Sequence, residues 1–130
     1  MNDEPVAEEL LRAVERFLEH DVVPKLDGVA KFHARVAANV VAVVAREIET
    51  ADAHERGEWD RLGELLESAE SLPPGREARR EGLRQRNSAL VARIRAGLGD
   101  AGPERAALLR HLRQTTADKL EVARPPRRRE

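Results

Sequence analysis

The chain has 130 residues, of which 41% are hydrophobic and 36% charged, and its formal net charge at pH 7 is −1. This length suits one domain with a real core. Only three residues are aromatic, and the aliphatic, charge-rich remainder is typical of helical bundles. The chain has no cysteine, which excludes disulfides and thiolate metal sites. The acidic N-terminal segment lacks the apolar region of a signal peptide, so we expect a cytoplasmic protein.

The first half of the chain predicts two helices. The first covers about residues 5–20, and its apolar stripe consists of Val6, Leu10, Val14, Phe17 and Leu18. After a connector with Pro24, residues 29–50 predict a central helix, since fourteen of the twenty residues in 29–48 are apolar. A helix that is apolar all round is a buried one, so we expect the others to pack around it. Charged residues interrupt the run, and we therefore expect no membrane span.

The second half predicts two or three further helices. Residues 52–69 form an acidic helix with Trp59 as a core anchor and a possible break at Gly57. A Pro-Pro-Gly linker at 71–75 leads to a basic helix over 76–98, and a glycine-rich stop precedes the last helix, 103–123. The predicted fold is all-α: an antiparallel bundle of four to five helices around the central one. We expect a single domain over 1–123 and a disordered basic tail over 124–130.

Three polar residues, His33, Arg35 and Asn39, lie on or beside the apolar central helix. Buried polar groups must be hydrogen-bonded, because an unpaired one costs about 1–3 kcal/mol. One interpretation makes the three structural, with Arg35 paired to a carboxylate. The other makes them a ligand site, with Asp118 and Lys119 of the last helix, where Arg35 and Lys119 hold a phosphate or carboxylate. Both interpretations stay open.

Most catalytic and cofactor motifs are missing. Gly97 to Gly102 matches G-x-G-x-x-G, but it follows a helix where a dinucleotide fingerprint follows a strand, so it predicts a helix–helix turn. The four histidines form no HxxxH or E-x-x-H pattern, and no serine sits in a nucleophile elbow. We therefore expect no metal, no cofactor and no catalytic residue, and an enzyme is the less favoured reading.

The net charge is small because an acidic first half of the chain and a basic second half nearly cancel. Residues 1–72 carry 8 basic and 17 acidic side chains, net −9, whereas residues 73–130 carry 15 and 7, net +8. Either the basic helices lie beside the acidic ones, or a basic face meets an anionic partner. Nucleic-acid binding by the basic helix is the weaker option, because no aromatic residues interleave its arginines. Those arginines are Arg76, Arg79, Arg80, Arg84 and Arg86.

Three stretches carry a family resemblance: AEELLRAVERFLEHDVVPKLDG, FHARVAANVVAVVAREIE and LRQTTADKLEVARP. They resemble a small bacterial helical domain of unknown function. The match is densest at Phe32, His33, Arg35, Val36, Ala37, Asn39, Asp118, Lys119, Leu120 and Pro125. That family occurs alone or C-terminal to kinases resembling aminoglycoside phosphotransferases, and its genes often lie near acyl-CoA dehydrogenases. Its C-terminal proline precedes an aromatic-containing segment, whereas Pro126 and three arginines follow here.

The resemblance implies an accessory role beside a phosphotransferase-like kinase and an acyl-CoA dehydrogenase, and it supplies no catalytic residues. The leading hypothesis is a non-catalytic interaction domain that packs a helix face on a second copy or on such a kinase. The alternative is a protein that binds an acyl-CoA or a phosphorylated acid, or a minor enzyme, with a site around His33, Arg35 and Asn39. Nucleic-acid binding is the third hypothesis.

Overall fold

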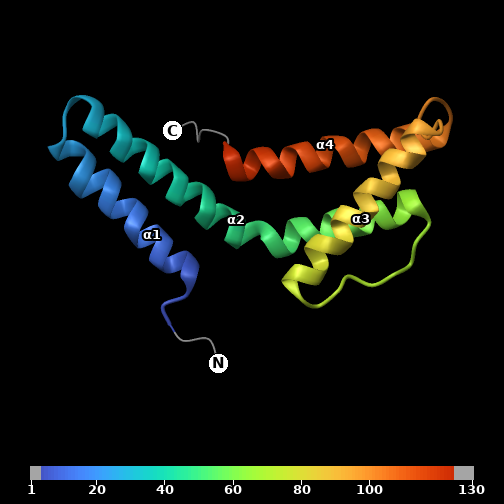
Figure 1. Cartoon of the computed structure of the whole chain (residues 1–130), viewed down its shortest axis with the longest axis horizontal. Helices are drawn as coiled ribbons and strands as arrows, with labels where there is room; N and C mark the ends of the chain where they lie inside the picture. The colour runs from blue at the N-terminus through green and yellow to red at the C-terminus, as the bar shows by residue number, and fades with distance from the viewer. Residues whose placement is uncertain (1–3, 125–130) are drawn as a thin grey trace. The chain divides into compact units, whose positions relative to one another are not determined.

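The computed structural model describes residues 4–124, and all regular structure in that part of the chain is helical. Its four α-helices are α1 (Ala7–Phe17), α2 (Gly28–Leu66), α3 (Arg76–Arg95) and α4 (Pro103–Ala123) (Figure 1). A π-helical turn (Leu18–Val22) and a 3-10 turn (Val23–Lys25) connect α1 to α2. The predicted all-α class is confirmed, and the limits predicted for the last helix agree with α4. The predicted disorder of the tail concerns residues that are almost all outside the described part.

The 39-residue helix α2 joins two segments that the sequence analysis separated. The break predicted after Thr50 is wrong, because Thr50 Oγ1 instead donates to the Arg46 carbonyl inside the helix at 2.8 Å. Gly57 is helical too, so neighbouring turns outweigh its cost of about 1 kcal/mol. The helix ends at Leu66, where Glu67 takes a left-handed backbone with φ 54° and the Ser68 amide bonds the Gly63 carbonyl.

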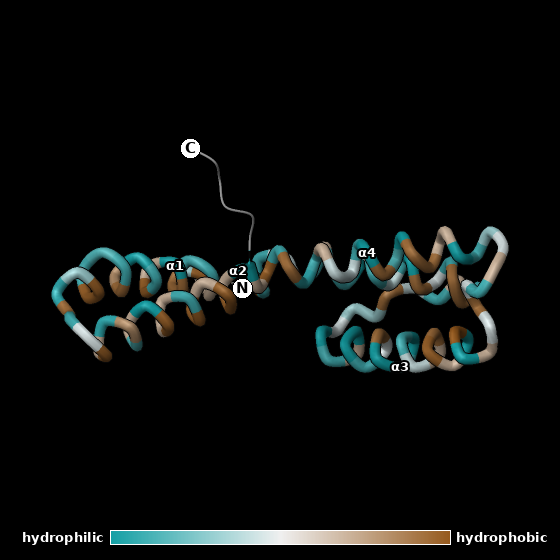
Figure 2. The backbone as a smooth tube through the Cα atoms, turned by 90° about the horizontal axis from the view of Figure 1, so that it is seen from above, coloured by the Kyte–Doolittle hydropathy of each residue, from teal (hydrophilic) through white to brown (hydrophobic). Residues whose placement is uncertain are grey.

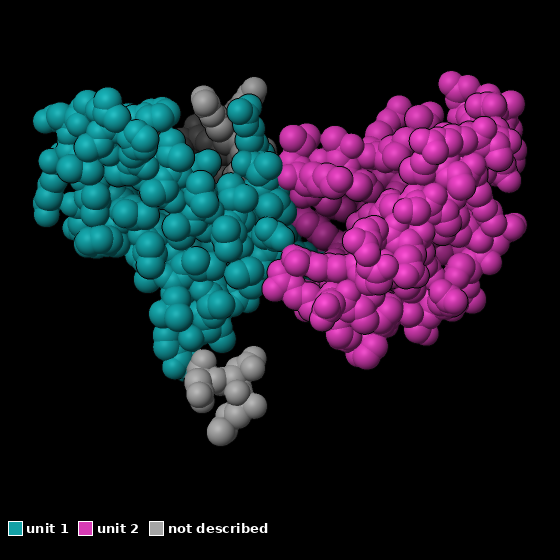
Figure 3. All heavy atoms as spheres, viewed as in Figure 1, with its two compact units in different colours: residues 1–51, 121–130 teal, residues 52–120 magenta. Residues whose placement is uncertain are grey.

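Contacts divide the chain into two compact units (Figure 3). Unit 1 comprises residues 1–51 and 121–130, and unit 2 comprises residues 52–120. Helix α2 contributes its first part to unit 1 and its second part to unit 2. The single domain expected over 1–123 stays a prediction.

Unit 1 is built on a hairpin in which α1 runs antiparallel to the first part of α2 (Figure 1). The Arg12 guanidinium joins the two helices by donating to both carboxylate oxygens of Glu49, at 2.9 and 2.8 Å. This contact lowers the pKa of Glu49, and together with Glu15 it raises the pKa of Arg12. Arg46 Nε donates to the Val122 carbonyl at 2.8 Å, which holds the end of α4 on α2.

Unit 2 contains the hydrophobic core. Its buried members come from α2, α3 and α4, and they are Trp59, Leu62, Leu65, Leu83, Leu90 and Leu108. The core position predicted for Trp59 is confirmed, since it is 5% exposed. Gly82 of α3 is needed here, because a Cβ at this position would lie 2.8 Å from Cζ3 of the Trp59 ring.

Arg86 is the one arginine buried among the described residues, at 7% exposure, and its guanidinium carbon lies 3.5 Å from the centroid of the Trp59 ring. It donates to the Trp59 carbonyl at 2.9 Å, to Ser68 Oγ at 3.1 Å and to the Glu70 carbonyl at 3.3 Å. The Trp59 indole N–H donates to the same Glu70 carbonyl at 2.7 Å. These bonds anchor the segment after α2 to the core through the planar, forked geometry of arginine.

The basic helix α3 pairs with acidic residues of α2. Arg79 lies 2.9 Å from the Asp52 carboxylate and 3.0 Å from that of Glu55, and Asn87 donates to Glu58 at 2.9 Å. Arg93 donates to the Leu65 and Leu66 carbonyls, which satisfies the C-terminal end of α2. Within unit 2, the charge split of the sequence therefore serves internal pairing.

Candidate functional site: an apolar face and a polar cleft on one hairpin

The hairpin of unit 1 exposes two rows of large hydrophobic side chains, spaced by three or four residues along each helix. We call them together the apolar face. Its members are Leu10, Val14 and Phe17 of α1 and Val29, Phe32, Val36, Val40 and Val44 of α2. Their exposed fractions run from 39% for Val44 to 72% for Val29. Hydropathy colouring shows hydrophobic residues recurring along both helices (Figure 2). Scattered apolar residues are normal on a surface, whereas each of these rows is continuous along its helix, which is typical of an interaction site.

The burial predicted for the central helix is therefore wrong for four of its valines, Val29, Val36, Val40 and Val44, whereas Val41 and Val43 are half-buried. Helix α2 turns small residues inward instead: Ala38, Ala42 and Ala45 are 2%, 5% and 0% exposed. Alanines allow close approach of neighbouring backbones, and the valine row lies about half a turn away from them. The apolar composition predicted that both sides of α2 are shielded from water. In the structure, only the side that carries the alanines is buried.

A polar cleft of about 500 Å³ lies between α1 and α2. Its lining residues are Glu15, Glu19, Val23, Arg35, Ala38, Asn39, Ala42 and Arg46. On α2, Ala38 and Ala42 lie about half a turn from the valine row, whereas Asn39 lies beside Phe32 and Val36 at helical spacing. Guanidinium groups bind carboxylates and phosphates through paired hydrogen bonds, so this wall can hold an anion. Glu15 of the opposite wall is occupied by Arg12, at 2.7 Å.

The structure brings together two of the five residues predicted as a polar cluster, because Arg35 and Asn39 share the cleft. His33 is exposed outside the cleft lining, and its ring meets that of Phe32 edge-on, with centroids 5.8 Å apart. Asp118 and Lys119 belong to unit 2. Sequence reasoning missed Arg46, Glu15 and Glu19, although the four-residue spacing of the two glutamates, one on α1 and one in the π-helical turn after it, could have indicated them.

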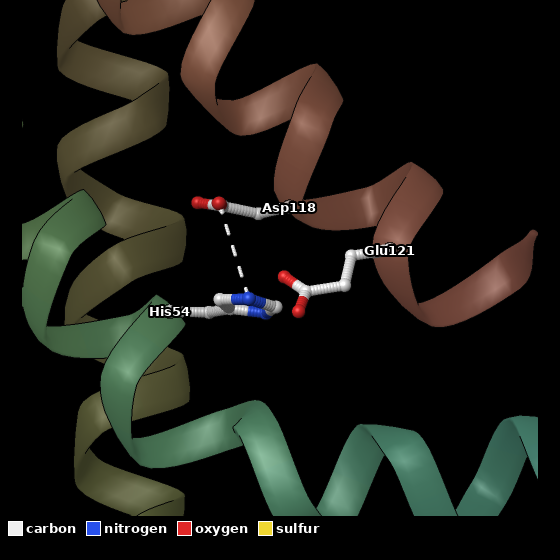
Figure 4. Close-up of side chains that lie close together, drawn as sticks. All are labelled: His54, Asp118 and Glu121. Atoms are coloured by element: carbon white, nitrogen blue, oxygen red, sulfur yellow. Dashed lines mark ion pairs between the residues drawn. The ribbon is translucent and has the colours of Figure 1, made fainter. Parts of the chain in front are cut away.

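Asp118 is half-buried on α4, and its partner is Arg61 of α2, whose Nη2 lies 3.4 Å from Asp118 Oδ2. The His54 ring and the Asp118 carboxylate point toward each other, with Nε2 and Oδ1 3.9 Å apart (Figure 4). Gln114 donates to the same Oδ1 at 2.7 Å. Arg61 already balances the negative charge of Asp118, which makes this arrangement suited to joining α2 and α4.

His111 is a buried titratable group of unit 2, at 2% exposure, and its Nδ1 has no hydrogen-bond partner in the described part of the chain. Burial lowers the pKa of His111, and the positive charge of Arg61 lowers it further, against a smaller opposing effect of Glu58. The neutral ring is therefore the form that this site favours.

We expect this burial to make the protein less stable in mild acid. Above the pKa of an unfolded histidine, about 6.5, the ring is neutral in both states and the full stability is present. Below it, the unfolded chain takes up the proton first, so stability falls by at most about 1.4 kcal/mol per pH unit until the lower folded pKa is passed. Urea unfolding at pH 7 and pH 5 measures the effect. His111→Leu should reduce the loss of unfolding free energy between pH 7 and pH 5, and the exposed-site control His33→Gln should keep that loss. An equal loss in wild type and His111→Leu would contradict this role of His111.

Helix α2 is also long and apolar enough, by length and composition alone, to cross a membrane. Core helices of water-soluble proteins pass the same test, so this is weak support for a span. Lys31, Arg35 and Asn39 lie inside the apolar stretch.

Comparison with known proteins places this chain without assigning an activity. Neither the curated proteins nor the solved structures contain a match. The family match begins at residue 24, so α1 precedes it, and it takes in α2, α3 and α4. The match to the family described as Domain of unknown function (DUF6285) covers residues 24–126, well over half of the sequence, and the chain therefore belongs to that family.

Proposed function

We propose that this chain is a non-catalytic accessory domain that acts through a protein–protein interface on its apolar face. The observation that carries the proposal is the exposure of eight large hydrophobic side chains on one hairpin. Leaving such side chains in water forgoes about 25 cal/mol per Å² of apolar surface, which a partner would recover. The working context that we propose is a phosphotransferase-like kinase and an acyl-CoA dehydrogenase.

Co-elution with those two enzymes, purified from the same source, tests this role. The matched variants are Val36→Asp on the apolar face and Val91→Asp on α3 of unit 2, because both valines are 45% exposed. We expect wild type and Val91→Asp to associate with a protein, whether one of the enzymes or a second copy, and Val36→Asp to lose that association. A wild-type chain that stays monomeric and co-elutes with neither enzyme would refute the role.

A second candidate function is the binding of an anionic small molecule, such as an acyl-CoA or a phosphorylated acid, in the polar cleft. Its support is the convergence of Arg35, Asn39 and Arg46 on one wall of the 500 Å³ cleft. Thermal-shift measurements with coenzyme A and acetyl phosphate test it. A higher melting temperature that Arg35→Ala abolishes would favour binding, and no shift at millimolar ligand would remove this candidate.

A further inference from the structure

We infer that unit 2 has an anion site of its own, where α2 meets α4, and that this site takes a small molecule carrying a phosphate monoester. An open pocket of about 570 Å³ lies there, and we call it the arginine pocket. Its lining residues are Arg61 of α2 and Arg110, Arg113, Gln114 and Ala117 of α4. Small-molecule sites usually measure about 300–1,000 Å³, so the size is suitable. The arginine pocket shares no residue with the polar cleft, whose lining belongs to unit 1.

The lining of the arginine pocket carries positive charge and no carboxylate. Arg110 and Arg113 are three residues apart, so they lie on the same side of α4. Both are exposed, and neither forms an ion pair or a side-chain hydrogen bond within residues 4–124. On α3, in contrast, Arg79 is paired with carboxylates and Arg93 with carbonyls. The pocket therefore keeps two guanidinium groups available for a ligand.

Arg61 forms the α2 wall of the pocket, and α4 holds its side chain in place. Its Nη2 donates to Thr115 Oγ1 and to Asp118 Oδ2, each at 3.4 Å. The other oxygen of Asp118 accepts a hydrogen bond from Gln114 Nε2 at 2.7 Å. Asp118 thus positions two members of the lining, one on each helix. Side chains that are fixed before binding lose less conformational entropy when the ligand arrives, which favours affinity.

Gly57 leaves space for the guanidinium of Arg61. It lies one helical turn before Arg61 in α2, and a Cβ at this position would come 3.1 Å from Arg61 Nη1, closer than an ordinary van der Waals contact. Glycine weakens the interior of a helix relative to alanine, and the composition of α2 gives no other reason for one here. The missing side chain therefore supports a role for the position of Arg61.

The balance of charge in the pocket indicates the class of ligand. The charge of Arg61 is balanced by Asp118, so the positive charges without a partner are those of Arg110 and Arg113. A phosphate monoester carries about −1.5 to −2 at pH 7 and has three strong acceptor oxygens, which suits both arginines together. A carboxylate or a phosphodiester has a single negative charge and would leave one arginine unbalanced. Guanidinium groups also bind phosphate through paired hydrogen bonds.

Isothermal titration calorimetry of the full chain with glycerol 3-phosphate tests the inference. We expect wild type to bind, and Arg113→Gln to raise the dissociation constant at least about tenfold, because a charge-assisted contact is lost. The control Arg105→Gln removes the same charge from an exposed position of α4 outside the pocket and should bind like wild type. No binding by wild type at millimolar ligand, or equal dissociation constants for the two variants, would overturn the inference.

The Arg113 variant should keep its helical circular dichroism spectrum, because the side chain is exposed. If it does not, Arg113→Lys keeps the charge without the planar fork and should still weaken binding, by less than Arg113→Gln. Binding that Arg113→Lys and Arg110→Lys both leave unchanged would count against the pocket.

Further outcomes separate the arginine pocket from other anion sites. Binding that is lost in Arg35→Ala and kept in Arg113→Gln would place the phosphate in the polar cleft and overturn the inference, as would binding of single-stranded DNA without binding of glycerol 3-phosphate. Flotation with phosphatidic acid vesicles, lost in Arg113→Gln, would keep the site and assign the phosphate to a lipid headgroup; no flotation is expected for a soluble ligand. None of these outcomes bears on the accessory role, whose variant is Val36→Asp, so the two proposals can fail separately.

Discussion

Replacing Arg86 by alanine is expected to lower the free energy of unfolding by about 3 kcal/mol or more, because each hydrogen bond to a charged group contributes about 1.5–3 kcal/mol. The variant loses three such bonds and leaves the carbonyl of Trp59 without its side-chain donor. It also loses the stacking on the Trp59 ring. Urea unfolding followed by far-UV circular dichroism measures the change.

Arg84 provides the control for this prediction, since it lies on the same helix with a side chain that is 76% exposed and paired with Glu81. Arg84→Ala should stay within about 0.5 kcal/mol of wild type, as is usual for surface substitutions. Arg86→Lys keeps the charge but loses the planar fork, and it should be intermediate. Equal unfolding free energies for the Arg84 and Arg86 alanine variants would contradict a structural role of Arg86.

Replacing Trp59 by alanine is the second large effect, with an expected loss of about 3–5 kcal/mol for an aromatic residue removed from a core. Its ring contributes to the cluster with Leu62, Leu65, Leu83, Leu90 and Leu108, and its N–H bonds the Glu70 carbonyl. Trp59→Phe keeps most of the ring and loses this bond, so about 1–2 kcal/mol is expected. The measurement is again urea unfolding by circular dichroism.

The two substitutions should not add. Arg86 and Trp59 are in direct contact, with 3.5 Å between the guanidinium carbon and the ring centroid, and residues in contact couple by about 0.5–3 kcal/mol. Trp59→Leu removes the ring and Arg86→Met removes the charge, so the double variant should lose less stability than the two single variants combined. Strict additivity would show that the cation–π contact contributes nothing to stability.

The sequence predicted the helical class well because helix signals are local. The start of α4 at Pro103 and the linker before α3 follow from proline and glycine chemistry, and Trp59 was expected in the core. The continuity of α2 was not predicted, since Gly57 and the change of composition at Thr50 suggested a break. Tertiary contacts in unit 2 outweigh those local preferences.

The site was harder to predict than the fold. An apolar run indicates surface that avoids water but does not tell whether the same chain or another covers it, and the valines of α2 were therefore expected in the core. Arg86 resembled its neighbours Arg80 and Arg84 in the sequence, yet it is buried against Trp59. Sequence spacing placed Arg35 and Asn39 beside Val36 and Val40, and the cleft that the two polar residues line becomes visible only once α1 has packed against α2.

The central claim is that the apolar face of the hairpin is a protein interface, and the most direct test is the molar mass of the wild-type chain in solution. Light scattering across a hundredfold range of concentration is the measurement. We expect either a mass above the 14.5 kDa of one chain at high concentration, falling on dilution, or a larger complex when the kinase or the dehydrogenase is added. A mass of 14.5 kDa throughout, for a chain that also co-elutes with neither the kinase nor the dehydrogenase, would contradict it.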